Sequence, residues 1–190
     1  MSSTKRVFVA TGHNRPFHRL LGLVEPLARD PRIELFTQKG SAAEAFPGLP
    51  GLAFLDKAEF ERRMDWADVI VTQAGAGAIS DARRVGHLPI VVPRRAALGE
   101  HIDDHQWQMA EVLSQAKLVY LLRDGEDLGQ LVWMHAGRRI ARAATQMPLI
   151  EALRRDLSRH DSTPLRAQGV ATAVRALLDR MRRLPGAAAK

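Results

Sequence analysis

The chain has 190 residues and a mass of 21.0 kDa, which suits one compact domain with a full core, with or without a helical appendage. Its 46% hydrophobic and 26% charged residues are typical of a globular protein and exclude a disordered one. It has no cysteine, which excludes a disulfide framework, a cysteine nucleophile and thiolate metal sites. The polar N-terminus and the absence of a long apolar run predict neither a signal peptide nor a membrane-spanning helix.

The net charge of +7 is concentrated in the last third of the chain. Residues 1–122 carry 15 Lys and Arg against 14 Asp and Glu, whereas residues 123–190 carry 13 against 7. This excess indicates an anionic partner for residues 123–190, or only an arginine-rich solvated surface. The chain has 10 aromatic residues and no known nucleic-acid reader motif, so we expect no nucleic-acid partner.

Strand and helix patterns alternate along residues 1–122. The expected strands are residues 5–11, 32–37, 52–55, 67–72, 88–93 and 118–122, and the expected helices are residues 17–29, 57–66, 76–85 and 103–115. Continuous apolar strands in such an alternation predict an α/β fold, with a parallel sheet covered by helices on both faces. Ligands bind such sheets beyond the carboxyl ends of the strands, so the loops at those ends are the candidate sites.

The strand signal stops after residue 124. Residues 127–144, 148–159 and 164–184 are expected to be helices. The last of them has an apolar stripe flanked by arginines, so it either packs on the sheet or docks onto a partner or membrane surface. We therefore expect a domain of residues 1–122 and a basic helical extension of residues 123–190.

The strongest local motif is a glycine-rich turn, TQAGAGAISD at residues 72–81, between an expected strand and an expected helix. Glycines at such a turn let the backbone approach a ligand closely. The start of the helix adds unpaired N–H groups and the positive end of the helix dipole. The turn is therefore either a site for a diphosphate or a tight connection without a ligand.

The same turn partly matches a dinucleotide-binding fingerprint. Gly75 and Gly77 fit the first two glycines of G-x-G-x-x-G, but Ser80 stands at the third. Arg94 and Arg95 follow the next strand, where the 2′-phosphate of NADP could bind. However, the turn follows a late strand, whereas the fingerprint normally follows the first.

A second polar cluster, GEHIDDHQ at residues 99–106, precedes and begins a helix. His101 and His105 have the spacing of a zinc-protease helix, but Ile102 stands where its general-base Glu belongs. Mixed carboxylate, imidazole and amide groups suit a hydroxyl-rich ligand such as a sugar. Alternatively Asp103 caps the helix and the other side chains are only solvated. The loop of residues 11–16 after the first strand can likewise hold an anion or merely turn the chain.

Read in order, several segments resemble the C-terminal, nucleotide-sugar-binding half of the GT-B glycosyltransferases of family 28. The resemblance covers about residues 5–122 and is carried by VFVATGHNRPF (7–17), QKG (38–40), FLD (54–56), WADVIV (66–71), GAGAISD (75–81), GHLPIVVP (86–93) and EHIDDHQ (100–106). Within this family the chain looks most like the free-standing catalytic subunits of split transferases of the exopolysaccharide or dolichol-pathway type. The fold implied is one Rossmann-like half of a GT-B enzyme.

The resemblance implies an inverting transfer of a sugar from a UDP-sugar to a lipid-linked acceptor, with no metal and no other cofactor. The implied donor-nucleotide site is Gly12, His13, Asn14, Leu55, Gly75, Ala76, Gly77, Ser80 and Asp81. The backbone near Leu55 would bind uracil, and Asp81, often Glu in the family, would bind the ribose hydroxyls. The implied sugar site is Glu100, His101, Asp104, His105 and Gln106. We assign no catalytic base in this chain, because in a fused relative the base lies in the other half.

The resemblance also implies a membrane-anchored partner subunit that supplies the acceptor-binding half. The chain is then expected to be inactive alone and to lie in the cytoplasm, at the inner face of the membrane, through that partner. Two alternatives remain at this point: an NADP-binding oxidoreductase, and a non-catalytic nucleotide-sugar-binding module recruited through its basic helices.

Overall fold

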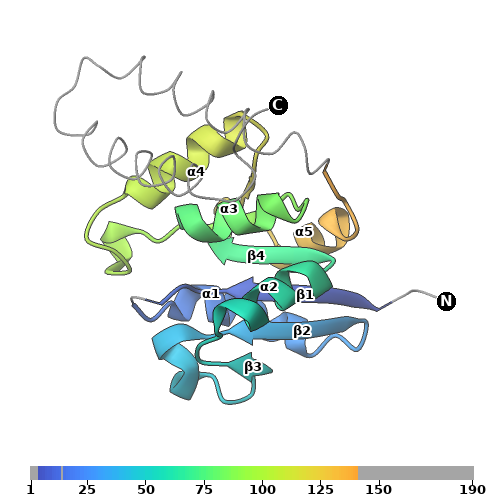
Figure 1. Cartoon of the computed structure of the whole chain (residues 1–190). Coiled ribbons are helices and arrows are strands. Elements are labelled where there is room, and N and C mark those ends of the chain that lie inside the picture. The colour runs from blue at the N-terminus through green and yellow to red at the C-terminus, as the bar shows by residue number, and fades with distance from the viewer. Residues whose placement is uncertain (1–3, 14, 141–190) are drawn as a thin grey trace, which may run out of the picture.

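The computed structural model describes residues 4–13 and 15–140 (Figure 1). Asn14 and the expected helices of residues 148–159 and 164–184 lie outside the described residues. The described elements are β1 (Lys5–Ala10), α1 (His18–Ala28), β2 (Ile33–Gln38), the 3-10 helix η1 (Gly40–Ala45), β3 (Gly51–Leu52), α2 (Lys57–Trp66), β4 (Val69–Gln73), α3 (Ala76–Arg84), β5 (Ile90–Val92), the 3-10 helix η2 (Ala96–Leu98), α4 (His105–Gln115), β6 (Tyr120–Leu121) and α5 (Leu128–His135). None of the described helices combines the length and the apolar character that crossing a membrane requires.

The six strands form one parallel sheet in the order β3-β2-β1-β4-β5-β6. In the central register Val7 of β1 lies between Leu35 of β2 and Val69 of β4. This is the doubly wound order in which the chain reverses direction across the sheet between β1 and β4. The predicted α/β fold is confirmed, and the reversal point is where such a sheet leaves room for a ligand.

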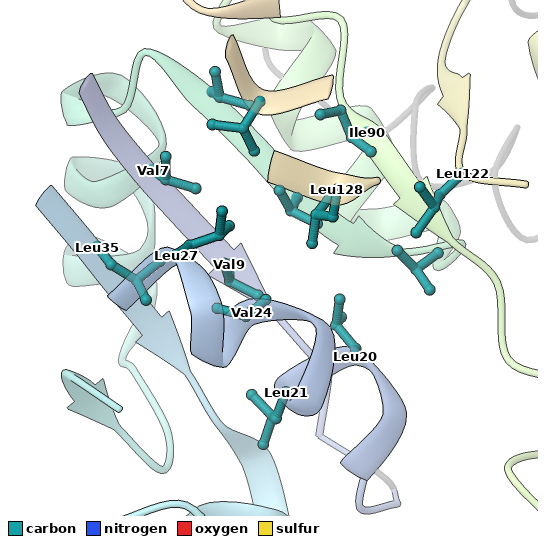
Figure 2. Packing of buried hydrophobic residues seen from close by; sticks show 14 of the residues in the cluster. Val7, Val9, Leu20, Leu21, Val24, Leu27, Leu35, Ile90, Leu122 and Leu128 are labelled. Atoms are coloured by element: carbon teal, nitrogen blue, oxygen red, sulfur yellow. The ribbon is translucent and has the colours of Figure 1, made fainter. Parts of the chain in front are cut away.

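One face of the sheet is covered by α1 and α5. Val7 and Val9 of β1 point to this face and pack with Val24 and Leu27 of α1, as Figure 2 shows. Leu128 at the start of α5 joins the same cluster. The first helix after residue 122 thus packs into the core of the sheet, while the predicted division at residue 122 stays a prediction.

The other face is covered by α2, α3 and α4, the first two of which lie in front of the sheet in Figure 1. Phe8 and Ile70, which alternate with the residues of the first face, pack here with Met64 of α2. Ile79 of α3 and Leu113 of α4 are fully buried. The alternation buries both faces, which explains why the strands read as continuous apolar runs.

Several expected boundaries were wrong. The strands expected at residues 52–55 and 118–122 are the two-residue strands β3 and β6, and η1 was not expected. The helix expected at residues 127–144 ends at His135, because the chain turns through Gly137, whose φ is 77°.

The start of α4 also differs from the prediction. This helix begins at His105 rather than Asp103, and its N-cap is Asp104, which makes no side-chain capping bond. Asp103 lies outside the helix, and its Oδ1 accepts a hydrogen bond from the His105 backbone N–H at 3.3 Å.

Candidate nucleotide-sugar site

A cavity of about 670 Å³ opens where the order of the sheet reverses, and we call it the larger cavity. Its walls come from the ends of β1, β2 and β4 and from α2 and α3. Six of the nine residues predicted to bind the nucleotide line it: Gly12, His13, Leu55, Gly75, Gly77 and Asp81. The volume lies within the range of ordinary small-molecule sites.

The start of α3 forms one wall of the larger cavity. Gly75 is its N-cap, and among the described residues no side chain caps this end of the helix. The first backbone N–H groups of this nine-residue helix are therefore left for another acceptor, and the helix dipole favours a negative one. Ala76 begins the helix, whereas Ser80 lies one turn further on and is buried at 5% exposure.

Two glycines meet around the Gln73 side chain at this wall. Gly12 has φ 85°, and a Cβ added there would lie 2.0 Å from the Gln73 Nε2 atom. A Cβ on Gly75 would lie 3.1 Å from the same atom. A side chain at either glycine would therefore crowd the Gln73 side chain, and both glycines line the larger cavity, so the loop after β1 and the turn after β4 present backbone to the same space.

The opposite wall is formed by α2 and the loop before it. Asp56 caps α2 by accepting a hydrogen bond from the Glu59 N–H at 2.7 Å, so this helix start, unlike that of α3, already has its acceptor. His13, which lines the cavity, stacks on Phe54 with ring centroids 5.6 Å apart and planes 19° from parallel. The start of α3 is therefore the wall of the larger cavity that favours an anion, and the start of α2 is not.

Sequence reasoning missed several residues of the larger cavity. Gln38 and Gln73 lie in motifs that were singled out in the sequence but were not assigned a role, whereas Lys57, Phe60 and Glu61 of α2 and Arg84 of α3 were not considered. Arg84 lies three residues after Asp81 on α3 and pairs with Glu61 of α2 at 3.2 Å. Helical spacing from Asp81 could have found Arg84, because residues three apart share a helix face.

A smaller cavity of about 180 Å³ lies beside the larger one. It is lined by Arg15, Gln73, Arg94, His101, Ile102 and Gln106, and Gln73 lines both cavities. Of the five residues predicted to contact the sugar, the structure brings His101 and Gln106 to this cavity.

The other three predicted sugar residues face different neighbours. Glu100 accepts two hydrogen bonds from Arg19, at 2.8 and 2.9 Å, and a third from the Arg95 backbone N–H at 3.0 Å. Asp104 accepts a hydrogen bond from the Ala96 N–H at 2.9 Å and lines a separate surface hollow. His105 contacts Asp103 through its Nδ1 atom. These three hold the loop between β5 and α4 in place, and direct contact between them and a sugar stays a prediction.

Asp103 lies between two imidazole rings. Its Oδ1 atom is 3.1 Å from the Nδ1 atom of His101 and also contacts that of His105. Partial burial raises the pKa of Asp103, but the hydrogen bonds and positive charge from the histidines outweigh it, and the net pKa is lowered. His101, Asp103 and His105 each offer one potential ligand atom, and these atoms lie within 4.8 Å of one another. Among the described residues, this is the cluster that could hold a metal ion. The prediction that the protein needs no metal stays a prediction.

Arg94 and Arg95, considered above for an NADP phosphate, are committed within the protein. Arg94 is 3% exposed and donates to Gln73 Oε1 at 2.7 Å. Its remaining donors reach four backbone carbonyls, those of Thr11 at 2.9 Å, Arg15 at 2.8 Å, Pro16 at 3.0 Å and Glu100 at 3.4 Å. Arg95 makes two hydrogen bonds to Asp124, at 3.0 and 2.7 Å. These interactions, together with a glycine turn after β4 rather than β1, argue against NADP.

The fold and the larger cavity together define a Rossmann-like domain whose ligand edge is suited to an anionic, nucleotide-like molecule. The family model described as "Glycosyltransferase family 28 C-terminal domain" matches residues 38–133, just over half of the chain. The chain belongs to this family, as the sequence motifs had indicated.

Similar proteins point the same way. Residues of this chain are 41% identical over 69 positions to the UDP-N-acetylglucosamine--N-acetylmuramyl-(pentapeptide) pyrophosphoryl-undecaprenol N-acetylglucosamine transferase of Shewanella sp. (strain ANA-3), covering 36% of this chain and 17% of that protein. The enzyme of the same name from Xanthomonas campestris pv. campestris (strain 8004) is 30% identical over 89 residues, covering 47% and 20%. The chain thus spans about a fifth of the curated relatives it matches.

The fold agrees with a solved structure. The crystal structure of the glycotransferase of kitacinnamycin superposes on 97% of this chain and 44% of its own, with a TM-score of 0.53 and 22% sequence identity. At this identity the likeness concerns the fold alone, and it agrees with the predicted Rossmann-like half of the GT-B fold.

Proposed function

We propose that this chain is the donor-binding catalytic part of an inverting glycosyltransferase that moves a sugar from a UDP-sugar to a lipid-linked acceptor. The observation that carries the proposal is the larger cavity of a family 28 domain, where the uncapped start of α3 meets the glycine loop after β1. The names of the Shewanella and Xanthomonas relatives specify a UDP-sugar and an undecaprenol-linked acceptor. We extend both substrate classes to this chain.

The nucleotide would lie along the larger cavity. Uracil would bind near the backbone of Leu55, and the Asp81 carboxylate would accept hydrogen bonds from the ribose hydroxyls. The diphosphate would lie over Gly75, within reach of the first N–H groups of α3 and the loop that begins at Gly12. His101 and Gln106 are the predicted sugar residues best placed for the sugar, because they line the adjoining smaller cavity.

The reaction would be a single displacement. The acceptor hydroxyl oxygen forms a bond to C1 of the sugar while the bond from C1 to the β-phosphate oxygen breaks, which inverts the configuration at C1. The hydroxyl proton passes to a base, which we place in the acceptor-binding half, and UDP leaves with the electron pair. The start of α3 stabilises the growing charge on UDP through its N–H groups and dipole, so no metal is required for this step.

The acceptor half is part of the same proposal. The described residues form one sheet, and the cavity that we propose as the donor site lies at the carboxyl ends of its strands. We propose that a membrane-anchored partner subunit supplies the acceptor site and holds this chain at the inner face of the membrane, in exopolysaccharide or glycan biosynthesis. The basic residues 123–190 would favour an anionic leaflet.

Ligand-dependent thermal stability tests the donor assignment. UDP and UDP-sugars should raise the melting temperature of the purified chain, because a ligand that binds the folded state stabilises it. NADPH should not. A non-catalytic module that has lost the nucleotide site would respond to none of them, and a response to NADPH alone would favour the oxidoreductase.

A transfer assay tests the partner assignment. The chain should transfer sugar after co-expression with a membrane protein encoded beside it, and it should float with membranes only in that case. Full activity of the purified chain alone on a soluble acceptor would contradict the need for a partner.

A further inference from the structure

The residues that line the smaller cavity offer hydrogen-bond donors but no negative charge. Among the described residues no carboxylate lines it. Arg94 can only donate, so the Gln73 and Gln106 side chains must turn their Oε1 atoms toward its Nε and backbone N–H, at 2.7 and 3.1 Å. This leaves the amide nitrogens of both glutamines as donors. Such a lining suits an oxyanion better than a neutral hydroxyl group.

The cavity also lies in an excess of positive charge. Burial lowers the pKa of Arg94, and the positive charges of Arg15 and Arg19 lower it further, while Glu100 acts in the opposite direction. Arg19 is paired with Glu100, so one carboxylate balances three guanidinium groups. Within residues 4–13 and 15–140, the Arg15 guanidinium has no ion-pair or hydrogen-bond partner, and it is exposed at the cavity.

Arg94 holds the backbone of the loop that carries Arg15. Arg94 donates to the backbone carbonyls of Thr11, Arg15 and Pro16, at 2.9, 2.8 and 3.0 Å. A buried guanidinium therefore fixes the backbone from which Arg15 extends. The free charge is presented at the cavity edge, next to Gln73 and hence next to the larger cavity.

We propose that the smaller cavity is an oxyanion subsite with Arg15 as its charged ligand, filled by an anionic group of the donor that lies beyond the first phosphate. This subsite rests on the proposed function. Under that function the oxyanion has two sources: the β-phosphate of UDP, or a carboxylate on the transferred sugar. Both have the geometry that a guanidinium binds through two parallel hydrogen bonds.

Calorimetric titration of the full chain separates these sources. UMP, UDP, UDP-glucose and UDP-glucuronic acid are titrated into the wild type, Arg15→Gln and Arg15→Lys. Arg29→Gln is the matched control, because Arg29 is an exposed arginine at the far end of α1 and its loss removes the same charge. Circular dichroism confirms that each variant is folded.

If the β-phosphate fills the subsite, Arg15→Gln weakens UDP about tenfold or more and leaves UMP unchanged. If a sugar carboxylate fills it, Arg15→Gln leaves UDP and UDP-glucose unchanged and weakens UDP-glucuronic acid by a similar factor. Partial recovery in Arg15→Lys supports either case. Affinities of Arg15→Gln that match those of Arg29→Gln for all four ligands overturn the subsite. A wild type that binds none of the ligands overturns the proposed function and the subsite with it.

Discussion

The two neighbouring cavities are built by different means. The larger one is made by backbone: two glycines that meet around Gln73 and the uncapped start of α3. The smaller one is made by side chains that hold one another, with Arg94 bound to Gln73 and to four carbonyls, and Gln106 bound to the Arg94 backbone N–H. Adding a side chain at one of the glycines should therefore impair the larger cavity. Removing a charged side chain should impair the smaller cavity.

Arg94→Gln should have the largest effect, because the Arg94 side chain holds together the segments that line the smaller cavity. It leaves the buried Thr11 carbonyl and three part-buried carbonyls without this donor, and a buried unpaired group costs about 1–3 kcal/mol, so we expect a loss on the order of 4 kcal/mol in the free energy of unfolding. Urea denaturation measures it, with Arg94→Lys retaining the charge but losing the planar fork. A loss below about 0.5 kcal/mol would mean that the loop after β1 is held by something else.

His87 is a buried titratable group that lies outside both cavities. Burial, and next the charge of Arg139, lower the pKa of His87 to about 4 from 6.5. As the pH falls below about 6.5, His87 of the unfolded state binds a proton that the folded state does not bind until about pH 4. The free energy of unfolding therefore decreases across this window. The expected loss is about 3 kcal/mol.

Urea denaturation of the wild type and His87→Gln from pH 7.5 to 4 measures this effect as the difference between the two pH profiles. Parallel profiles would contradict the buried neutral imidazole. UDP affinity should not follow the His87 titration, because His87 lines neither cavity.

Glu100→Ala should act mainly on stability rather than on ligand selection. It removes the ion pair of the half-buried Arg19, which keeps only its hydrogen bond to the Pro93 carbonyl, and it removes the acceptor of the Arg95 N–H, so we expect a loss of about 2 kcal/mol. Denaturation together with titration of UDP and a UDP-sugar measures both effects. Gln106→Ala is the paired variant, and it should weaken the UDP-sugar more than UDP. Unchanged stability with selective loss of UDP-sugar binding in Glu100→Ala would contradict this expectation and support the predicted contact between Glu100 and the sugar.

Gly12→Ala should have a smaller effect on stability and a clear effect on the ligand. A left-handed φ costs a non-glycine residue about 1–2 kcal/mol, and the new Cβ displaces the Gln73 side chain. UDP affinity should fall because both cavities share Gln73. Gly22→Ala is the control: nothing lies within 4 Å of its Cβ, and it should stabilise α1 by up to about 1 kcal/mol. Equal UDP affinity in the two variants would contradict the backbone-built wall.

The sequence could predict what depends on local pattern. The alternation of strands and helices predicted the parallel sheet, and the glycine turn predicted one wall of the larger cavity, since each depends on residues close together in the chain. The sequence could not show that Glu100 faces Arg19, 81 positions away, or that Arg94 serves the loop after β1. A charged residue in a loop has the same local pattern whether it faces a ligand or a distant neighbour.

We propose that UDP binds with its diphosphate over the turn at Gly75. Calorimetric titration of UDP into the wild type and Gly75→Val tests it most directly, with circular dichroism to show that the variant is folded. A valine there would bring its Cβ within 3.1 Å of the Gln73 Nε2 atom and place two methyl groups over the start of α3. We expect single-site binding of UDP to the wild type and none to the folded variant. No binding to the wild type, or equal affinity in a folded Gly75→Val protein, would contradict it.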